Sequence, residues 1–410
     1  MDADEKAARY RWVIVAAGIC GLFASLGIGR FALGMLLPAM GEALDLSYVE
    51  MGGIGTVNFC GYLLAVLLCG KLSARYSPRL LIGAALLLVG LSMIAIGFVE
   101  QLSLITFFYF LTGVGSALSN VPIMALISTW FPPTSRGRAA GLVVIGNGLG
   151  IIMSGYLVPK LTSGGYGWQM SWITLGGVAC CSAAVCWLLI RNSPSALETD
   201  RGRRLFAHPK HGGGIALEPA EQRLKPVFIH CAVIYFLFGF TYVIYATFFV
   251  TSLVQERGFS EQEAGYLWSW VGFLSLVSGP LFGTLSDRFG RKAGLVTVFS
   301  IQAAAYTMAI SSLPEQFLYV SIFCFGIVAW SVPSIMAALI GDTAGPQRAA
   351  AVFGFVTFVF GIGQMAGPFC AGALAEMTGG FTLSFSLAAL LGLSAALLSS
   401  KLPGPSGRNR

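Results

Sequence analysis

GTLSDRFGRK, residues 283–292, is a polar and basic stretch between two long apolar segments, and the chain carries a second version of it. The earlier version reads GKLSARYSPR and occupies residues 70–79, again between apolar segments. Two more pairs follow in the same order: NVPIM (120–124) with SVPSIM (331–336), and SRGRAAG (135–141) with PQRAAA (346–351). Three ordered matches predict two halves of one architecture, an arrangement typical of transporters.

The segments around these stretches are long and apolar enough to cross a membrane. The chain has 410 residues, of which 56% are hydrophobic and 10% are charged, whereas about 25% of the residues in a soluble domain are charged. A helix needs about 20 apolar residues to span a bilayer core of roughly 30 Å. We therefore expect an all-α membrane protein with twelve transmembrane helices, near residues 12–37, 51–70, 80–99, 102–129, 139–159, 169–190, 227–253, 264–284, 293–312, 316–340, 350–373 and 381–400.

The basic residues predict how these helices are oriented. With twelve spans, all but three of the 25 lysines and arginines fall on one side; the exceptions are Lys160 and Arg257 on the other side and Arg30 within a span. Cytoplasmic loops of membrane proteins are enriched in lysine and arginine. We therefore expect both termini in the cytoplasm and a multi-pass protein of the cell (inner or plasma) membrane. The net charge of +7 then follows from topology and indicates no nucleic-acid partner.

The polar stretch between the sixth and seventh apolar segments predicts the domain organisation. Residues 191–225 contain three prolines and a triple glycine and show no lasting apolar period, as expected of a linker. The predicted parts are a six-helix half at 1–190, a cytoplasmic linker at 191–226, a second half at 227–400 and a cytoplasmic tail at 401–410. No metal-ligand cluster, glycine-rich phosphate loop or nucleophile–base pair occurs, so we expect no metal, no cofactor and no enzymatic activity.

GTLSDRFGRK matches every defined position of the loop signature G-x-L-[AS]-D-[RK]-x-G-[RK]-[RK], and the chain thereby resembles the major facilitator superfamily. WFPPTSRGRAAG (130–141) resembles the loop after the fourth span in organic-anion branches of that family. The resemblance implies pseudo-symmetric halves that rock around a central cavity, and a fold that needs one chain, so we expect a monomer in contact with membrane lipids. The first-half loop departs from the signature at Ala74, Ser77 and Pro78, and Tyr109 stands where related transporters often carry an arginine.

The second-half loop is expected to form a conformational latch at the cytoplasmic side. Asp287 would face the positive amino end of the eleventh span, near Arg348, while the neighbouring cations would face lipid headgroups or carbonyls. The residues assigned to this latch are Gly283, Asp287, Arg288, Gly290, Arg291 and Arg348.

Arg30 is the single Lys, Arg, Asp or Glu deep within a predicted span. An arginine at the centre of a transmembrane helix costs about 2.5–3.5 kcal/mol on insertion scales, so it needs a partner or a wet cavity. Its planar fork of five donors matches a carboxylate. Two alternatives are snorkelling to the outer headgroups and hydrogen bonding to the carbonyls of a broken helix. We expect Arg30 to bind the carboxylate of a small organic anion.

Uncharged polar and aromatic residues on other spans are the expected remaining substrate contacts. Each of them alone is also an ordinary packing or interhelical hydrogen-bonding residue. Together with Arg30 they predict a cavity that is cationic at one point and otherwise apolar with hydroxyl groups. The candidates are Asn58, Tyr62, Asn120, Asn147, Tyr242, Tyr245, Trp330, Ser331 and Gln364.

The sequence therefore predicts a secondary active transporter of small organic anions, with monocarboxylates as the first choice. Proton coupling stays open, because no buried Asp or Glu is present to carry the proton, and His230 near the start of the seventh span is a candidate relay. An exporter of drugs or metabolites is the alternative, although the chain lacks the cavity carboxylate and the fifth-span Gly-Pro pair expected of a cationic-drug pump. A ligand sensor on a transporter scaffold ranks lower, since neither tail could hold a signalling domain.

Overall fold

The computed structural model describes residues 3–193, 226–344 and 348–402. These residues form fifteen α-helices and two π-helical segments, with no strand among them, so the all-helical prediction is confirmed. Linker residues 194–225 and tail residues 403–410 lie outside the described residues. The chain divides into two compact units, and residues 31–59 and 151–171 group with the C-terminal part of the chain.

Unit 1 comprises residues 1–30, 60–150 and 172–218. Its helical elements, some of which continue into unit 2, are α1 (Ala3–Leu22), η1 (Phe23–Ile28), the second part of α3 (Tyr48–Arg75), α4 (Pro78–Ile96), α5 (Leu102–Trp130), the first part of α6 (Pro133–Leu161) and most of α7 (Gly167–Leu189).

Unit 2 comprises residues 31–59, 151–171 and 219–410. Besides the remaining parts of α3, α6 and α7, its elements are α2 (Ala32–Leu44), η2 (Thr162–Tyr166), α8 (Pro226–Gln255), α9 (Glu261–Ser275), α10 (Ser278–Phe289), α11 (Arg291–Met308), α12 (Gln316–Val328), α13 (Ser331–Ala344), α14 (Ala349–Thr378) and α15 (Thr382–Ser400).

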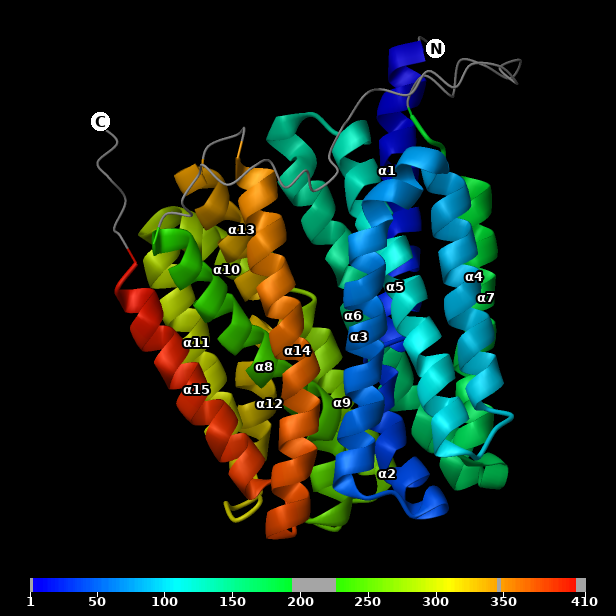
Figure 1. The fold of residues 1–410 in the computed structure, drawn as a ribbon, viewed down its shortest axis with the longest axis vertical. Helices are drawn as coiled ribbons and strands as arrows, with labels where there is room; N and C mark the ends of the chain where they lie inside the picture. Colours follow the sequence, from blue (N-terminus) through cyan, green and yellow to red (C-terminus); the bar gives the residue numbers. More distant parts are fainter. Residues whose placement is uncertain (1–2, 194–225, 345–347, 403–410) are drawn as a thin grey trace. The chain divides into compact units, whose positions relative to one another are not determined.

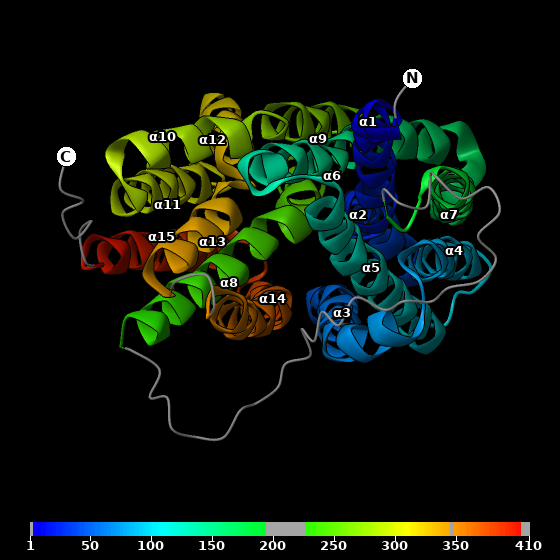
Figure 2. The same ribbon diagram turned by 90° about the horizontal axis from the view of Figure 1, so that it is seen from above.

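Small residues bring the helices of unit 1 into close contact. In Figures 1 and 2, α4 and α7 run side by side, and a Cβ placed on Gly90 of α4 would lie 2.8 Å from the carbonyl oxygen of Gly176 on α7. A Cβ on Gly115 of α5 would lie 2.7 Å from the carbonyl oxygen of Ala85 on α4. Lipid provides no hydrophobic drive between membrane helices, so this close van der Waals packing holds them together.

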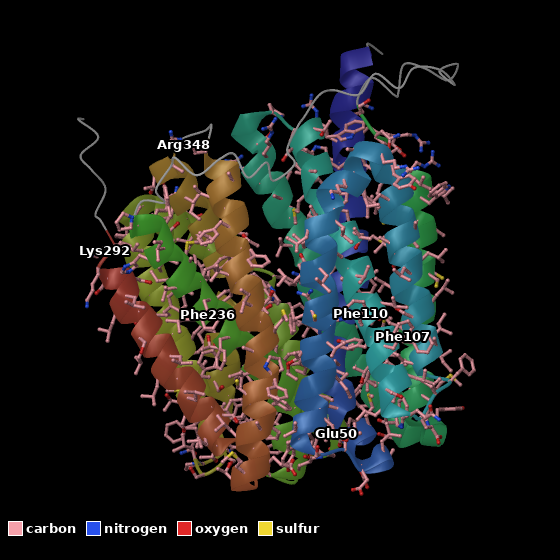
Figure 3. All side chains as sticks on the ribbon, viewed as in Figure 1. Glu50, Phe107, Phe110, Phe236, Lys292 and Arg348 are labelled. Carbon is pink, nitrogen blue, oxygen red and sulfur yellow. The ribbon has the colours of Figure 1, made fainter. Side chains whose placement is uncertain are left out.

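In unit 2, α8 lies at the centre of the packing. Figure 2 shows α14 beside it, and a Cβ on Gly367 of α14 would lie 2.6 Å from Cγ2 of Val243 on α8. The ends of this unit differ in charge: Lys292 and Arg348 lie toward one end, and Glu50 lies toward the other (Figure 3). This separation agrees with the excess of lysine and arginine that the sequence predicts for one side of the membrane.

The twelve predicted spans all fall on helices, but three of them are broken where the sequence predicted continuous helices. The first is broken by η1 and a turn at residues 29–31. The eighth bends by 41° between α9 and α10, and the tenth is broken between α12 and α13. Among the described residues, nine helical segments are long and apolar enough to cross a membrane, or ten with the bent pair; the fifth and sixth predictions merge in that count, and α11 falls outside it.

The two breaks in unit 2 satisfy each other's polar groups. The hydroxyls of Ser278 and Ser331 lie 2.8 Å apart, and the backbone N–H of Trp330 donates to the Ser278 oxygen over 3.0 Å. Both serines are fully buried. Irregular backbone at membrane depth is tolerated where protein groups replace the lost helical hydrogen bonds, which explains why breaks at these two places are stable.

Adjacent glycines on α7 provide a test of the close packing in unit 1. A Cβ on Gly176 would lie 2.7 Å from the carbonyl oxygen of Gly90, whereas a Cβ on Gly177 would meet nothing within 4 Å. We expect Gly176→Ala to destabilise the protein by about 1–3 kcal/mol through overpacking, as a lower midpoint of thermal unfolding in detergent. Gly177→Ala should leave it unchanged or raise it slightly. Equal midpoints for the two variants would contradict this packing.

Candidate functional site

Arg30 lies at the break of the first span, directly after the π-helical segment η1. The Gly29 N–H donates to Ala24 O, five residues earlier, over 3.0 Å, and the Arg30 N–H donates to Leu26 O over 3.2 Å. The Arg30 side chain is buried, with 8% of the residue exposed. Local π-helical geometry frequently occurs at functional sites. Of the alternatives left open by the sequence, the broken helix is therefore present, and Arg30 lies in it.

Tyr62 of α3 covers the Arg30 guanidinium. The guanidinium carbon lies 4.3 Å from the centroid of the Tyr62 ring, well within cation–π range. The Nδ2 group of Asn120 on α5 donates a hydrogen bond to the Tyr62 hydroxyl over 2.9 Å. Arg30, Tyr62 and Asn120, which the sequence selected from three different spans, thus form one connected group within unit 1, which we call the Arg30 cluster.

Side chains of α5 satisfy backbone carbonyls around the break. The Tyr109 hydroxyl donates to the Arg30 carbonyl over 3.0 Å, and the Ser116 hydroxyl lies 2.7 Å from the carbonyl oxygen of Ser25. The Tyr109 ring packs edge-on against Trp172, with centroids 5.6 Å apart. The role of Tyr109 was missed by sequence reasoning, which noted only that it replaces an arginine common in related transporters.

Asn147, the other predicted substrate contact of unit 1, lies on α6 against the same break. A Cβ on Gly27 of η1 would lie 2.9 Å from Gly146 O and 3.3 Å from Asn147 O. The Asn147 side chain is buried, and its Oδ1 has no hydrogen-bond partner among the described residues. It therefore adds a polar acceptor to unit 1 close to the backbone that carries Arg30.

Within unit 2, Tyr242 and Gln364 form a second polar contact among the predicted residues. Gln364 of α14 donates through Nε2 to the Tyr242 hydroxyl. The Tyr242 ring stacks on Phe360, at 6.1 Å and 6°, and meets Trp330 edge-on at 6.2 Å. These residues, which we call the Tyr242 group, present a hydroxyl, an amide and an indole beside stacked aromatic rings.

Three other predicted residues of unit 2 lie in different surroundings. Tyr245 is fully buried, stacks between Phe249 and Phe325, and its hydroxyl lies 3.0 Å from that of Ser321. This is the environment of a packing residue. The Ser331 hydroxyl forms a hydrogen bond with that of Ser278 at the helix breaks described above. Asn58 is buried on α3.

Four of the predicted latch residues, Asp287, Arg288, Gly290 and Arg291, lie at the corner between α10 and α11. Gly290 has a φ of +93°, in the region that favours glycine. Arg291 pairs with Asp287, donates through Nε to Asp342 over 3.1 Å and through Nη1 to Ser286 over 2.9 Å. Partial burial alone would lower the pKa of Arg291, but its hydrogen bonds with Asp342 and Asp287 raise it overall.

This corner differs from the expected latch in its partners. Asp287 contacts Arg291, four residues along the chain, while Arg348 is exposed at the start of α14. Arg288 lies 5.6 Å from the centroid of the Phe289 ring, and Gly283 lies on α10 with open space around it. The contacts described for these residues join elements within unit 2.

Tyr109→Phe tests whether the hydroxyl of α5 holds the break in place. The variant keeps the ring on Trp172 but leaves the buried Arg30 carbonyl without this donor, which costs about 1–3 kcal/mol. We expect a lower thermal unfolding midpoint, together with a Kd for any ligand of Arg30 raised by about tenfold. Tyr156→Phe, at an exposed tyrosine of α6, is the control. An unchanged Kd for Tyr109→Phe would show that this hydrogen bond does not position Arg30.

Comparison with protein families identifies the class of this chain. A family model described as "Uncharacterised MFS-type transporter YbfB" matches residues 22–400. The hexuronate transporter of Bacillus subtilis (strain 168) is 26% identical, with 90% of this chain and 89% of the relative covered. The 4-hydroxybenzoate transporter PcaK of Acinetobacter baylyi is 23% identical, with 96% and 91% covered.

A solved structure has the same fold. It is the crystal structure of a bacterial homologue of the human lysosomal transporter Spinster, in an inward-facing and occupied conformation. The TM-score is 0.72 at 17% sequence identity, and the similarity covers 95% of this chain and 96% of the other. Family, relatives and fold together make this chain a multi-pass membrane protein of the transporter class, as the loop signature predicted.

Proposed function

Because the chain belongs to the family of MFS-type transporters, we propose that it is a secondary transporter of small organic anions, most directly monocarboxylates, in the plasma membrane. Arg30 binds the carboxylate, and transport proceeds by alternating access. The two relatives named for a hexuronate and for 4-hydroxybenzoate support this substrate class, since both compounds are organic acids with one carboxylate.

The observation that carries the proposal is the Arg30 cluster. A buried arginine, 8% exposed as a whole residue, is costly in a membrane helix, and the other two members of the Arg30 cluster, Tyr62 and Asn120, are neutral. Stacking on the Tyr62 ring leaves the N–H donors of a guanidinium in its plane, which is the plane in which a carboxylate binds it in a bidentate way. The charge and geometry suit one carboxylate, which would neutralise the cation on binding.

The Tyr242 group is the proposed contribution of unit 2 to substrate recognition. Its stacked rings suit an apolar or planar molecular surface, and its hydroxyl and amide suit polar substituents. Substitutions at Tyr242, Gln364 and Trp330 test this contribution separately from that of Arg30. Tyr245 and Ser331 are assigned no substrate contact, because their described surroundings account for them as structural residues. Asn58, buried on α3, stays a proposed substrate contact.

The corner at Arg291 is the proposed control element of alternating access. Its two carboxylate partners, Asp287 and Asp342, connect α10, α11 and α13. We propose that these pairs keep the corner rigid while the transporter changes conformation. Because Asp287 and Asp342 are more than half exposed, each pair contributes at most about 1 kcal/mol.

Uptake into proteoliposomes tests the role of Arg30. We expect saturable uptake of radiolabelled 4-hydroxybenzoate and glucuronate, with KM raised about 10- to 100-fold in Arg30→Gln, the range for loss of a hydrogen-bonded charge. Arg30→Lys keeps the charge but not the fork, so its KM should fall between wild type and Arg30→Gln. Repeating each assay with an imposed proton gradient determines whether transport is proton-coupled.

Arg257 provides the matched control, because its guanidinium donates to the carbonyls of Ile310 and Leu313 and so has a structural role. Arg257→Gln should lower the unfolding midpoint and leave the KM of the remaining folded protein unchanged. Normal carboxylate uptake by Arg30→Gln, or transport of a cationic dye without carboxylate uptake, would contradict the proposal and favour an exporter.

A further inference from the structure

We infer that the substrate carries a hydroxyl group in addition to its carboxylate, and that Asn120 accepts a hydrogen bond from that hydroxyl. The inference rests on the proposed function and makes its substrate class narrower: a hydroxylated carboxylate whose hydroxyl lies remote from the carboxylate. It begins with the distribution of donors and acceptors in the Arg30 cluster.

The Asn120 amide is satisfied on one side only. Its Nδ2 donates to the Tyr62 hydroxyl over 2.9 Å, while its Oδ1 is buried and has no hydrogen-bond partner among the described residues. A buried acceptor without a donor costs about 1–3 kcal/mol, and such atoms are rare in native proteins. A hydroxyl on the bound substrate would supply the missing donor, because an O–H group can donate where a carboxylate can only accept.

Tyr62 sets the distance between the two recognition points. Its ring lies over the Arg30 guanidinium at 4.3 Å, and its hydroxyl, at the far end of the ring, receives the Asn120 hydrogen bond. The carboxylate-binding cation and the amide that carries the unsatisfied acceptor thus contact the same phenol, one at the face of its ring and the other at its hydroxyl. A hydroxyl next to the carboxylate would be too close to reach both, whereas a hydroxyl several bonds away could do so.

Unit 1 contains a second buried acceptor that lacks a hydrogen-bond donor. Asn147 on α6 is buried, and its Oδ1 also lacks a hydrogen-bond partner among the described residues. Its backbone contacts η1 just before Arg30, through the close approach at Gly27. Two buried amide oxygens without donors, in the unit that holds one buried cation, favour a ligand that combines negative charge with hydroxyl donors over a purely apolar acid.

Matched pairs of acids test the inference in proteoliposomes. The probes are radiolabelled 4-hydroxybenzoate against benzoate, and 6-hydroxyhexanoate against hexanoate, with 4-methoxybenzoate as an analogue that accepts but cannot donate. We expect kcat/KM of wild type to be at least tenfold higher for the hydroxylated member of at least one pair. Asn120→Leu should bring that ratio close to one, because the acceptor is lost while Arg30 is unchanged.

Asn192→Leu is the control, since this asparagine accepts from the Arg79 N–H at the exposed end of α7; it should keep the wild-type ratio. Asn120→Ala is the second variant if Asn120→Leu does not elute as a folded monodisperse protein, and it should lose the ratio as well. Three results would overturn the inference. They are no preference of wild type for the hydroxylated acids, equal kcat/KM for 4-methoxybenzoate and 4-hydroxybenzoate, and a kcat/KM ratio that both variants leave unchanged. Loss of all uptake in Arg30→Gln would then still support the proposed function, whereas normal uptake in that variant would contradict the proposed function itself.

Discussion

The need to satisfy backbone carbonyls where a membrane helix is broken is the constraint on which the site depends. No water is present in the bilayer core, so each freed carbonyl requires a protein donor. In unit 1 the Tyr109 hydroxyl of α5 donates to the Arg30 carbonyl, and the Ser116 hydroxyl lies within hydrogen-bond distance of the carbonyls of both Ser25 and Thr112. Because these donors stabilise the break, Arg30 lies in irregular backbone beside Tyr62.

Unit 2 follows the same rule with a different outcome. Ser278 and Ser331 join the breaks between α9 and α10 and between α12 and α13, so that these polar groups satisfy one another. The break between α12 and α13 also places Trp330 against Tyr242. Broken helices therefore position the polar chemistry in both units, while the unbroken helices α4, α8 and α14 supply the close-packed scaffold around them.

Hydropathy was sufficient to predict the helical segments, and the rarity of buried charge was sufficient to select Arg30. The link from Tyr62 to Asn120 joins residues that the sequence had selected one by one. The breaks could not be predicted, because the groups that stabilise them are distant in sequence: 79 residues separate Arg30 from Tyr109. The partner of Asp287 was missed for the opposite reason, since a local i,i+4 contact with Arg291 competes with the expected long-range one. Tyr245 shares a helix face with Tyr242 in the sequence pattern, yet its hydroxyl is taken up by Ser321 in the interior of unit 2.

The central claim is that Arg30 binds the carboxylate of a transported organic acid. An experimental structure of the protein with 4-hydroxybenzoate or glucuronate bound tests it most directly, because such a structure shows which group holds the anion. The account predicts a carboxylate within hydrogen-bond distance of the Arg30 guanidinium, with Tyr62 still stacked on that guanidinium. A carboxylate bound elsewhere, with the Arg30 guanidinium donating to backbone carbonyls alone, would contradict it and leave Arg30 as a structural residue of the break.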